Sequence, residues 1–296
     1  MSIFGSYLMV DWSARSIPQK GRNSIWYCLL QRGQDAVPRN AATRRSAMAE
    51  IRELLLGNVA HGITTLVGFD FAYGFPKGFA AALSLRGEPW LAAWREISRR
   101  IQDQDDNSNN RFEVASDLNA VLSGGAFPFW GCPSRFEKST LWPRRQRQHC
   151  EKDLPEYRIT DRWLRGPQPV WKLSYAGSVG SQTLLGIPHL MSLRYDDQLS
   201  PVSRVWPFEI GLRPPQQRSA RKCLIVHAEI YPSIVPAQVP SRGEVKDATQ
   251  VRSAADYFAD LDKAGKLATF FAGPMSLTNE QRSQIESDEG WILGVL

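Results

Sequence analysis

Four short apolar runs along the chain predict buried strands. They are Tyr7–Trp12, Asn23–Leu30, Ile63–Phe71 and Lys222–Tyr231. Runs of this kind, rich in aliphatic and aromatic residues, are typical of strands buried inside a sheet. The link between the first two runs contains a proline and a glycine and is long enough for a hairpin loop. A shorter run, Val205–Ile210, contains a proline, so it predicts an edge strand or a bulged strand.

Apolar residues at helical spacing predict longer helices between these strands. In Thr43–Leu56 the spacing is clear, and Gly57 and Asn58 are expected to end the helix. Pro188 predicts a bend in a later helix, because proline removes a backbone hydrogen bond. The other predicted helices are Lys77–Leu85, Pro89–Gln102, Gly177–Arg194 and Val245–Leu261.

The middle of the chain is less regular than its two ends. Gln102–Asn110 is polar and acidic, which predicts an exposed loop or a frayed helix end. Gly124–Gly166 is rich in proline, tryptophan and arginine and predicts a long irregular excursion, a feature that is uncommon unless it serves a site. Because the regular elements lie at both ends, residues 1–296 are interpreted as one α/β domain, a mixed sheet flanked by helices, with an insertion at about residues 77–170.

Three of the predicted strands carry an acid near their end. These acids are Asp11, Asp70 and Glu229. Strand ends and the loops that follow them form the binding crevice of an α/β sheet. A carboxylate in a dry sheet is destabilising by several kcal/mol unless it is paired or bound to a cation, so a shared role is indicated. The expected role is to hold Mg²⁺ or Mn²⁺; two such ions about 4 Å apart can stabilise both the attacking and the leaving oxygen of a phosphoryl displacement.

The last predicted helix adds a fourth acid. With Asp247 in the first turn, that residue heads the apolar face of the helix, whereas Asp256 falls on the opposite, solvent side. Asp247 and Gln250 also match a helix capping box, which is an alternative explanation for the acid. The residues that share the face of Asp247 are Val251, Ala254, Ala255, Phe258 and Leu261.

The strand-end acids have simpler explanations too. Asp11 and Asp70 can be turn formers or helix caps, although the apolar flanks of Asp70 argue against this. Glu229 can form a buried pair with an arginine, or with His227 on the same strand face. Glu209 is a weaker candidate and is interpreted as a surface acid on an edge strand.

Composition adds few restrictions. The chain has 296 residues, 43% hydrophobic and 22% charged, with a net charge of +6, which permits a polyanionic partner without requiring one. Its four cysteines form no CxxC pair, so neither a zinc knuckle nor a disulfide framework is indicated and a cytoplasmic setting is expected. We expect neither a signal peptide nor a membrane span.

Two further segments are candidates for binding phosphate. Gly177–Gln182 (GSVGSQ) precedes a predicted helix, where Ser178, Ser181 and Gln182 could present donors, with Lys172 adding charge. The segment lacks the Lys-Ser/Thr ending of a P-loop, and a plain helix cap explains it equally well.

A basic segment in the irregular excursion is the second candidate. Arg144, Arg145 and Arg147 follow Trp142 and could grip a nucleic-acid backbone or stack on bases. The alternative is a solvated run of charges.

Several sequence blocks resemble a known family. The blocks are VDWSA (Val10–Ala14), GFDFAYGFP (Gly68–Pro76), GSVGSQTLLGIP (Gly177–Pro188), VWPFE (Val205–Glu209) and AEIYPS (Ala228–Ser233). They resemble the DUF429 family of predicted nucleases, which is grouped with the ribonuclease H-like superfamily. Gly124–Gly166 lies outside the resemblance.

The resemblance implies a ribonuclease H-like fold and a metal site of two to four carboxylates. By position, Asp11 matches the first-strand acid, Asp70 the acid after the helix–strand unit and Asp247 the acid that opens the last helix. Glu229 has no secure counterpart. Gln250 stands where many superfamily nucleases have a further acid, which argues against a second metal.

Three functions remain open at this stage. The first is a metal-dependent phosphodiester hydrolase acting on nucleic acid, with Asp11, Asp70, Asp247 and Glu229 as its acids and a metal-activated water attacking phosphorus. The second is a small-molecule phosphotransferase or NTP hydrolase of related fold, for which the chain is short. The third is a non-catalytic scaffold that binds a partner. The substrate, the number of metal ions and the oligomeric state do not follow from the sequence.

Overall fold

A single mixed sheet stands at the centre of the structure, a computed structural model that describes residues 2–215, 224–236, 240 and 243–296. Its strands are β1 (Ser6–Asp11), β2 (Ile25–Gln31), β3 (Val37–Ala41), β4 (Thr65–Phe69), β5 (Ser203–Val205) and β6 (Ile225–Glu229). The six strands are arranged in the order β3-β2-β1-β4-β6-β5. The first three are antiparallel neighbours, whereas β1, β4, β6 and β5 run parallel. The predicted α/β class with a mixed sheet is therefore confirmed.

The register brings the carboxyl ends of three strands to one edge of the sheet. Val10 on β1 lies beside Phe69 on β4, and Phe69 lies beside Glu229 on β6. Because the strands are parallel and in step, the residues that follow these positions leave the sheet together. The three predicted strand-end acids therefore come from neighbouring strands at the same edge.

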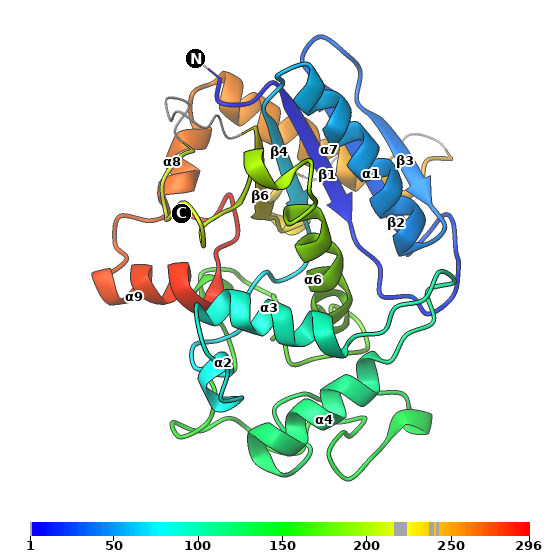
Figure 1. Cartoon of the computed structure of the whole chain (residues 1–296), viewed down its shortest axis with the longest axis vertical. Coiled ribbons are helices and arrows are strands. Elements are labelled where there is room, and N and C mark those ends of the chain that lie inside the picture. The colour runs from blue at the N-terminus through cyan, green and yellow to red at the C-terminus, as the bar shows by residue number, and fades with distance from the viewer. Residues whose placement is uncertain (1, 216–223, 237–239, 241–242) are drawn as a thin grey trace.

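Helices cover both faces of the sheet (Figure 1). They are α1 (Arg44–Ala60), α2 (Phe79–Ala82), α3 (Pro89–Arg100), α4 (Arg111–Ser123), α5 (Ile159–Arg162), α6 (Gly180–Arg194), α7 (Lys246–Lys263), α8 (Leu267–Ala272) and α9 (Asn279–Gln284). Short single-turn segments lie at Ser134–Phe136, Ser200–Val202, Pro232–Ile234 and Ile285–Glu289.

Alternation along β1 divides the buried side chains into two cores. Leu8 and Val10 point to the face covered by α1, α3 and α6, whereas Tyr7 and Met9 point to the face covered by α7 and α8. In Figure 1 α7 lies behind the sheet, and α1 and α6 lie in front of it. A period of two along the strand thus gives each face its own hydrophobic layer, because successive side chains point to opposite sides.

The sequence predicted most of the longer elements but missed β3, α4 and the short helices α5, α8 and α9. Val37–Ala41 forms β3, although its sequence VPRNA is not apolar, and Arg111–Ser123 forms α4. The predicted end of α1 at Gly57 is wrong, since the helix runs on to Ala60. The predicted strand at Val205–Ile210 is shifted, because β5 ends at Val205 and pairs only with β6 as an edge strand.

The region between β4 and α6 lies below the carboxyl edge of the sheet in Figure 1. Its described helices α2, α3 and α4 precede the segment Gly124–Gly166, which is mostly irregular as predicted and contains only the short α5 and a single turn at Ser134–Phe136. The segment packs against the rest of the molecule through buried residues such as Phe129 and Leu141.

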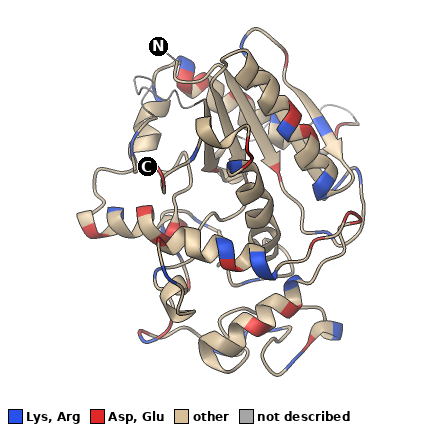
Figure 2. Cartoon of the chain, viewed as in Figure 1, with Lys and Arg blue, Asp and Glu red and all other residues tan. Residues whose placement is uncertain are grey.

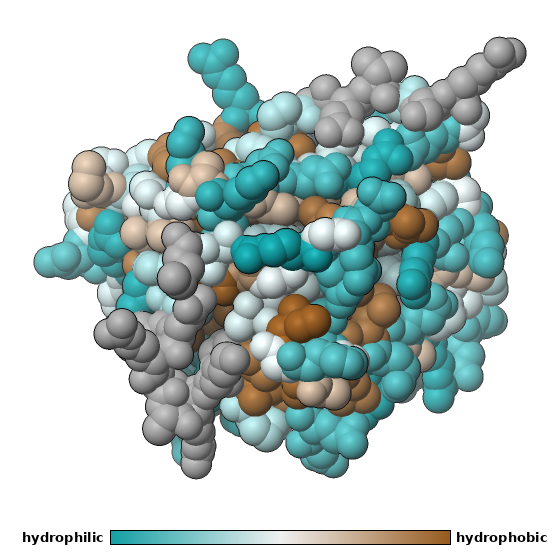
Figure 3. Space-filling view, turned by 90° about the horizontal axis from the view of Figure 1, so that it is seen from above, coloured by the Kyte–Doolittle hydropathy of each residue, from teal (hydrophilic) through white to brown (hydrophobic). Residues whose placement is uncertain are grey.

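Charged residues are spread over the outer surfaces of the helices and loops, whereas the central strands carry few (Figure 2). Seen from above, the surface is largely hydrophilic, with small separate apolar patches (Figure 3). No helix in the described ranges is both long enough and apolar enough to span a membrane.

Candidate functional site

Asp11 and Asp70 meet at the carboxyl edge of the sheet. Asp11 is the last residue of β1, and Asp70 directly follows β4, its parallel neighbour. The backbone N–H of Trp12 donates to Asp70 Oδ1 at 2.7 Å, which fixes that carboxyl group beside the end of β1. The two carboxyl groups also lie close enough to shift each other's pKa.

Burial and mutual repulsion make this acid pair hard to ionise. Burial raises the pKa of Asp70 to about 7, an effect that the hydrogen bond from Trp12 partly opposes. Burial, and then the charges of Asp70 and Asp247, raise the pKa of Asp11 well above its usual value. In the described part of the chain neither carboxyl group forms an ion pair with a lysine, arginine or histidine. The pair is therefore an uncompensated site of negative charge.

Asp247 stands near the pair without joining it. It lies in the first turn of α7, and its Oδ2 accepts a hydrogen bond of 2.6 Å from the backbone N–H of Asn23. The capping-box explanation does not apply, because Val245 is the N-cap residue and no side chain caps the helix. Asp247 instead acts at a distance, through a charge that opposes ionisation of Asp11 and Asp70.

A metal site of three acids is not assembled in the structure. Among the described residues, no group of three or more His, Cys, Asp or Glu side chains could hold a metal ion. Asp247 therefore does not complete a three-carboxylate site with Asp11 and Asp70. Two carboxylates are nevertheless a fitting donor set for Mg²⁺, which keeps several waters and commonly binds through only one or two carboxylates. The residues present fit one such cation held by Asp11 and Asp70.

Glu229 is compensated by an arginine, unlike the acid pair. Arg158 Nη1 and Nη2 donate to its two carboxylate oxygens at 2.7 Å each, and the backbone N–H of Tyr73 adds a bond of 3.0 Å. The same guanidinium group binds Asp161, with Nη2 to Oδ1 at 2.8 Å. Burial raises the pKa of Glu229, while Arg158 acts in the opposite direction. The buried pairing with an arginine is thus the alternative found, and His227 hydrogen-bonds Ser203 instead.

A cavity of about 880 Å³ opens beside the acid pair. Asp11 and Asp247 line one part of it, together with the loop between β1 and β2. The opposite lining comes from the start of α4, from Arg135, and from the segment that leads into α6. Acidic and basic side chains therefore face the same space, which is suited to a ligand that carries phosphate next to a cation.

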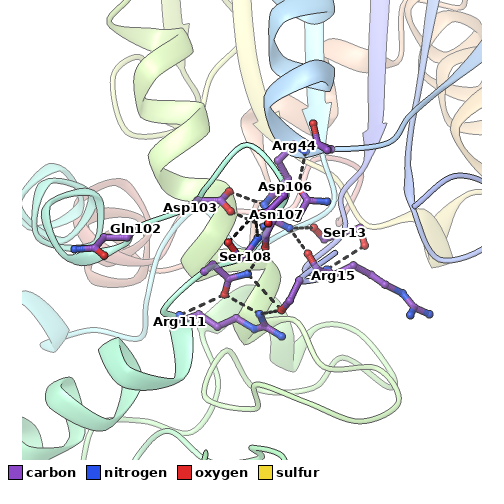
Figure 4. Close-up of polar contacts among 12 residues, drawn as sticks. Ser13, Arg15, Arg44, Gln102, Asp103, Asp106, Asn107, Ser108 and Arg111 are labelled. Carbon is purple, nitrogen blue, oxygen red and sulfur yellow. Dashed lines mark hydrogen bonds and ion pairs between the residues drawn. The ribbon is translucent and has the colours of Figure 1, made fainter. Parts of the chain in front are cut away.

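Arg44 holds the cavity loop in place through contacts with its backbone (Figure 4). Its Nε and Nη2 donate to Asp103 at 2.6 and 2.5 Å, while its Nη1 donates to the carbonyl oxygens of Ser13 and Arg15 at 3.0 and 2.7 Å. The side-chain Oδ1 of Asn107 accepts from the backbone N–H of Arg44 at 2.9 Å. The chain that follows Asp11 is thereby fixed by a buried ion pair.

The expectation that Gln102–Asn110 is an exposed loop is met by most of its residues but not by Asn107. The Asn107 side chain is buried, and Asp103 also accepts a hydrogen bond of 2.8 Å from His189 Nε2. No role was expected for His189, which also packs edge-on against Trp12, with ring centroids 5.3 Å apart. Asp103 and Asn107 are therefore polar residues with partners inside the molecule, whereas most of the loop faces solvent.

The Gly177–Gln182 segment lies at the cavity but is largely occupied by internal contacts. Ser178, Ser181 and Gln182 all line the cavity. However, Ser181 Oγ donates to the carbonyl of Leu173 at 2.6 Å, and Gln182 Nε2 donates to the carbonyl of Trp12. Ser178 is the one whose hydroxyl has no hydrogen bond within the described chain.

The side chain of Lys172 is bound to neighbouring residues of the chain. Its Nζ donates to Gln168 Oε1 at 3.1 Å and to the carbonyl of Ala176 at 2.8 Å. The residue does not line the cavity beside Asp11.

The predicted basic segment is partly neutralised within its own loop. Arg145 binds Glu156 through two bonds of 2.7 and 3.0 Å, and Arg147 binds Asp153 through two bonds of 2.5 and 2.8 Å. None of Arg144, Arg145 and Arg147 lines the cavity. Their contact with nucleic acid stays a prediction.

Two acids outside the site behave differently from what the sequence indicated. Glu209 is not a surface acid, because it forms two hydrogen bonds of 2.7 and 2.6 Å with Arg194. Asp256 is half-buried on α7 rather than on its solvent side, and it does not line the cavity.

Sequence reasoning missed the basic side of the cavity. Arg15, Arg111 and Arg135 line it, and so does the aromatic residue Tyr175. These residues are far apart in the chain and share no motif, so only the fold brings them to the same cavity.

Comparison of the chain with family models, with curated proteins and with solved structures gave no match. The resemblance to the DUF429 family and the ribonuclease H-like superfamily therefore stays a prediction. What the site can do has to be argued from its own geometry.

Proposed function

We propose that this chain is a metal-dependent phosphodiester hydrolase of ribonuclease H-like fold that acts on nucleic acid. The observation that carries the proposal is the Asp11–Asp70 pair, two partly buried carboxyl groups at the ends of adjacent parallel strands with no basic partner among the described residues. The strand order, an antiparallel β3-β2-β1 followed by parallel β4 and β6, supports the fold.

A divalent cation between these carboxylates would supply positive charge for the phosphoryl oxygens and Lewis acidity for activating water. Asp11 and Asp70 would have to be ionised to bind it. The backbone N–H of Trp12 keeps Asp70 oriented by its 2.7 Å hydrogen bond. Asp247 adds negative charge, which attracts a cation but also opposes ionisation of both carboxyl groups.

Space on both sides of the acid pair supports a diester over a monoester. A second cavity, of about 270 Å³, is lined by Asp70 and Arg158, and it shares Ser178 and Gln182 with the larger cavity beside Asp11. A phosphorus atom at the pair could therefore carry one substituent into each cavity. A monoester would leave one of them empty.

The phosphotransferase alternative gains less support. It needs Gly177–Gln182 to cradle a nucleoside triphosphate, but Ser181 and Gln182 already donate to backbone carbonyls. The scaffold alternative requires an acidic cluster that is broken apart, whereas Asp11 and Asp70 lie close enough to shift each other's pKa.

Hydrolysis of bis(p-nitrophenyl) phosphate and of labelled oligonucleotides with Mn²⁺ or Mg²⁺ tests the proposal. We expect cleavage that EDTA abolishes and that Asp70→Asn reduces at least about a hundredfold. Asp197→Asn is the matched control, because Asp197 is an exposed carboxylate away from the cavity. Circular dichroism verifies that both variants are folded. Full activity in Asp70→Asn would contradict the proposal, as would faster turnover of p-nitrophenyl phosphate than of the diester.

A further inference from the structure

Arg111 places a guanidinium group in the wall of the larger cavity without an acidic partner. Its Nε donates to Ser181 Oγ at 2.9 Å, and its Nη1 donates to Ser16 Oγ and Asn109 Oδ1 at 2.8 and 2.7 Å. Within the described ranges it forms no ion pair, and its Nη2 group has no hydrogen-bond acceptor. The nearby acid Asp103 is already bound on two sides by Arg44 (Figure 4).

The positive charge of Arg111 is therefore poorly compensated. Burial, together with the charge of Arg44, lowers the pKa of Arg111 to about 10, so the group is still charged at neutral pH. The charges of Asp103 and Glu113 oppose this effect, but within the described ranges neither forms an ion pair with Arg111, so an anionic ligand would stabilise the guanidinium group. Phosphate is the fitting anion, since guanidinium groups bind it through two parallel hydrogen bonds.

A second arginine extends this wall. Arg135 also lines the cavity, and its charge lowers the pKa of Arg111, so the two guanidinium groups face the same region. Each lies over an aromatic ring: Arg111 is 4.4 Å from the ring centroid of Phe112, and Arg135 is 5.0 Å from that of Phe136. The two rings pack against each other with centroids 4.7 Å apart. The aromatic pair thus holds two like charges close to each other.

Tyr175 adds an exposed ring at the same cavity. Its side chain is 58% exposed, although a large aromatic residue would gain from burial. Its backbone φ of 75° lies in the left-handed region, which is unfavourable for a residue with a large side chain. The hydroxyl group donates to the carbonyl of Cys132 at 3.2 Å, which fixes the ring in this position. Strained backbone of this kind is concentrated at binding sites.

We propose that Arg111, Arg135 and Tyr175 form a subsite for one nucleotide unit, with its phosphate on the two guanidinium groups and its base stacked on the tyrosine ring. The proposal rests on the proposed function in that it names the substrate class of the same cavity. A volume of about 880 Å³ is that of a small-ligand pocket, which a single-stranded segment or a free nucleotide can enter and a duplex cannot. Stacking on an aromatic ring likewise requires an unpaired base.

Binding in EDTA tests the subsite separately from catalysis. A short fluorescein-labelled single-stranded oligonucleotide is titrated with the full chain at low salt, and binding is followed by fluorescence polarisation. We expect Arg111→Gln and Arg135→Gln each to weaken binding about tenfold and to reduce its salt dependence. Arg135 is exposed, so its variant tests the subsite even where Arg111→Gln is unstable. Tyr175→Ala should weaken binding about tenfold, whereas Tyr175→Phe keeps the ring and the affinity.

Arg86→Ala is the control for a general loss of charge, because Arg86 is exposed and lies away from the cavity. Competition with unlabelled single strand, duplex, nucleoside 5′-monophosphate and inorganic phosphate identifies the source of the phosphate. Displacement by the single strand or by the monophosphate, with the duplex much weaker, supports the subsite.

Two results would overturn the subsite: equal affinity in Arg111→Gln, Arg135→Gln and Arg86→Ala, or equal binding of duplex and single strand. Loss of binding in the arginine variants, with no metal-dependent cleavage by the wild type, would leave the subsite standing and remove the hydrolase.

Discussion

Two groups of acids lie at the same edge of the sheet, and they differ in whether an arginine accompanies them. Glu229 ends β6 and, with Asp161, encloses the guanidinium group of Arg158. Asp11 and Asp70 lie at the ends of the two neighbouring strands, where each shifts the pKa of the other and neither has a basic partner among the described residues. At equivalent strand ends, Glu229 is therefore neutralised by an arginine, whereas Asp11 and Asp70 have no basic partner among the described residues.

The two groups of acids are expected to have different roles, one in stabilising the fold and the other in binding a ligand. A buried ion pair with every oxygen bonded is a folding element, which holds the irregular segment against the sheet. A buried carboxyl pair without a cation is unfavourable for folding, so it is expected to persist only where a ligand uses it. Substitution of Arg158 should therefore lower stability, whereas substitution of Asp70 should raise stability and remove metal binding.

Removing the arginine should give the largest effect on stability. We expect Arg158→Met to lower the free energy of unfolding by about 3 to 5 kcal/mol, because Glu229 and Asp161 are left as uncompensated buried charges. Urea denaturation at pH 7 measures the change. Adding Glu229→Gln to that variant should restore part of the loss, and a loss below about 1 kcal/mol in Arg158→Met would show that the arginine is not needed there.

Removing a carboxylate from the Asp11–Asp70 pair should stabilise the protein. Because the folded-state pKa of Asp70 is about 7, above its unfolded value, the wild type binds a proton on folding and loses stability as pH rises from about 4 to about 7. Asp70→Asn should therefore be more stable than the wild type by roughly 2 to 4 kcal/mol at pH 8, a difference that vanishes below about pH 4. Thermal unfolding of both proteins across this range measures it. A variant less stable than the wild type at pH 8 would contradict the comparison.

Asp247 should have the smallest effect. It repels Asp11 and Asp70 from a distance, so Asp247→Asn is expected to raise stability at pH 8 by only about 0.5 kcal/mol. The asparagine can still accept the hydrogen bond from Asn23. Urea denaturation beside Asp197→Asn gives the comparison, and a change as large as that of Asp70→Asn would place Asp247 inside the pair rather than near it.

The sequence predicted those elements in which the pattern of apolar residues within one segment indicates which side chains are buried. β1, β2, β4 and β6 are apolar runs, and α1, α6 and α7 show helical spacing. β3 was missed because it lies at the sheet edge, where Pro38, Arg39 and Asn40 need no burial. α4 was missed because its buried residues include Ser116 and Asn119, which obscure the apolar period.

The candidate site divides in the same way. Asp11 and Asp70 were predictable because an acid at the end of an apolar run can be recognised within one short stretch of sequence. The partner of Glu229 was not, since Arg158 comes from an irregular segment distant in the chain. Arg111 and Arg135 reach the cavity only through the packing of Phe112 on Phe136, a contact that no local pattern contains.

The central claim is that Asp11 and Asp70 hold one divalent cation. Isothermal titration of Mn²⁺ into the full chain near pH 7, repeated in buffers of different ionisation enthalpy, tests it most directly. Because the pKa values of Asp11 and Asp70 are raised, we expect one ion bound per chain with about one proton released, retention of binding in Asp197→Asn, and loss of it in Asp11→Asn and Asp70→Asn. Absence of Mn²⁺ binding to the wild type, or unchanged binding in Asp70→Asn, would contradict the account.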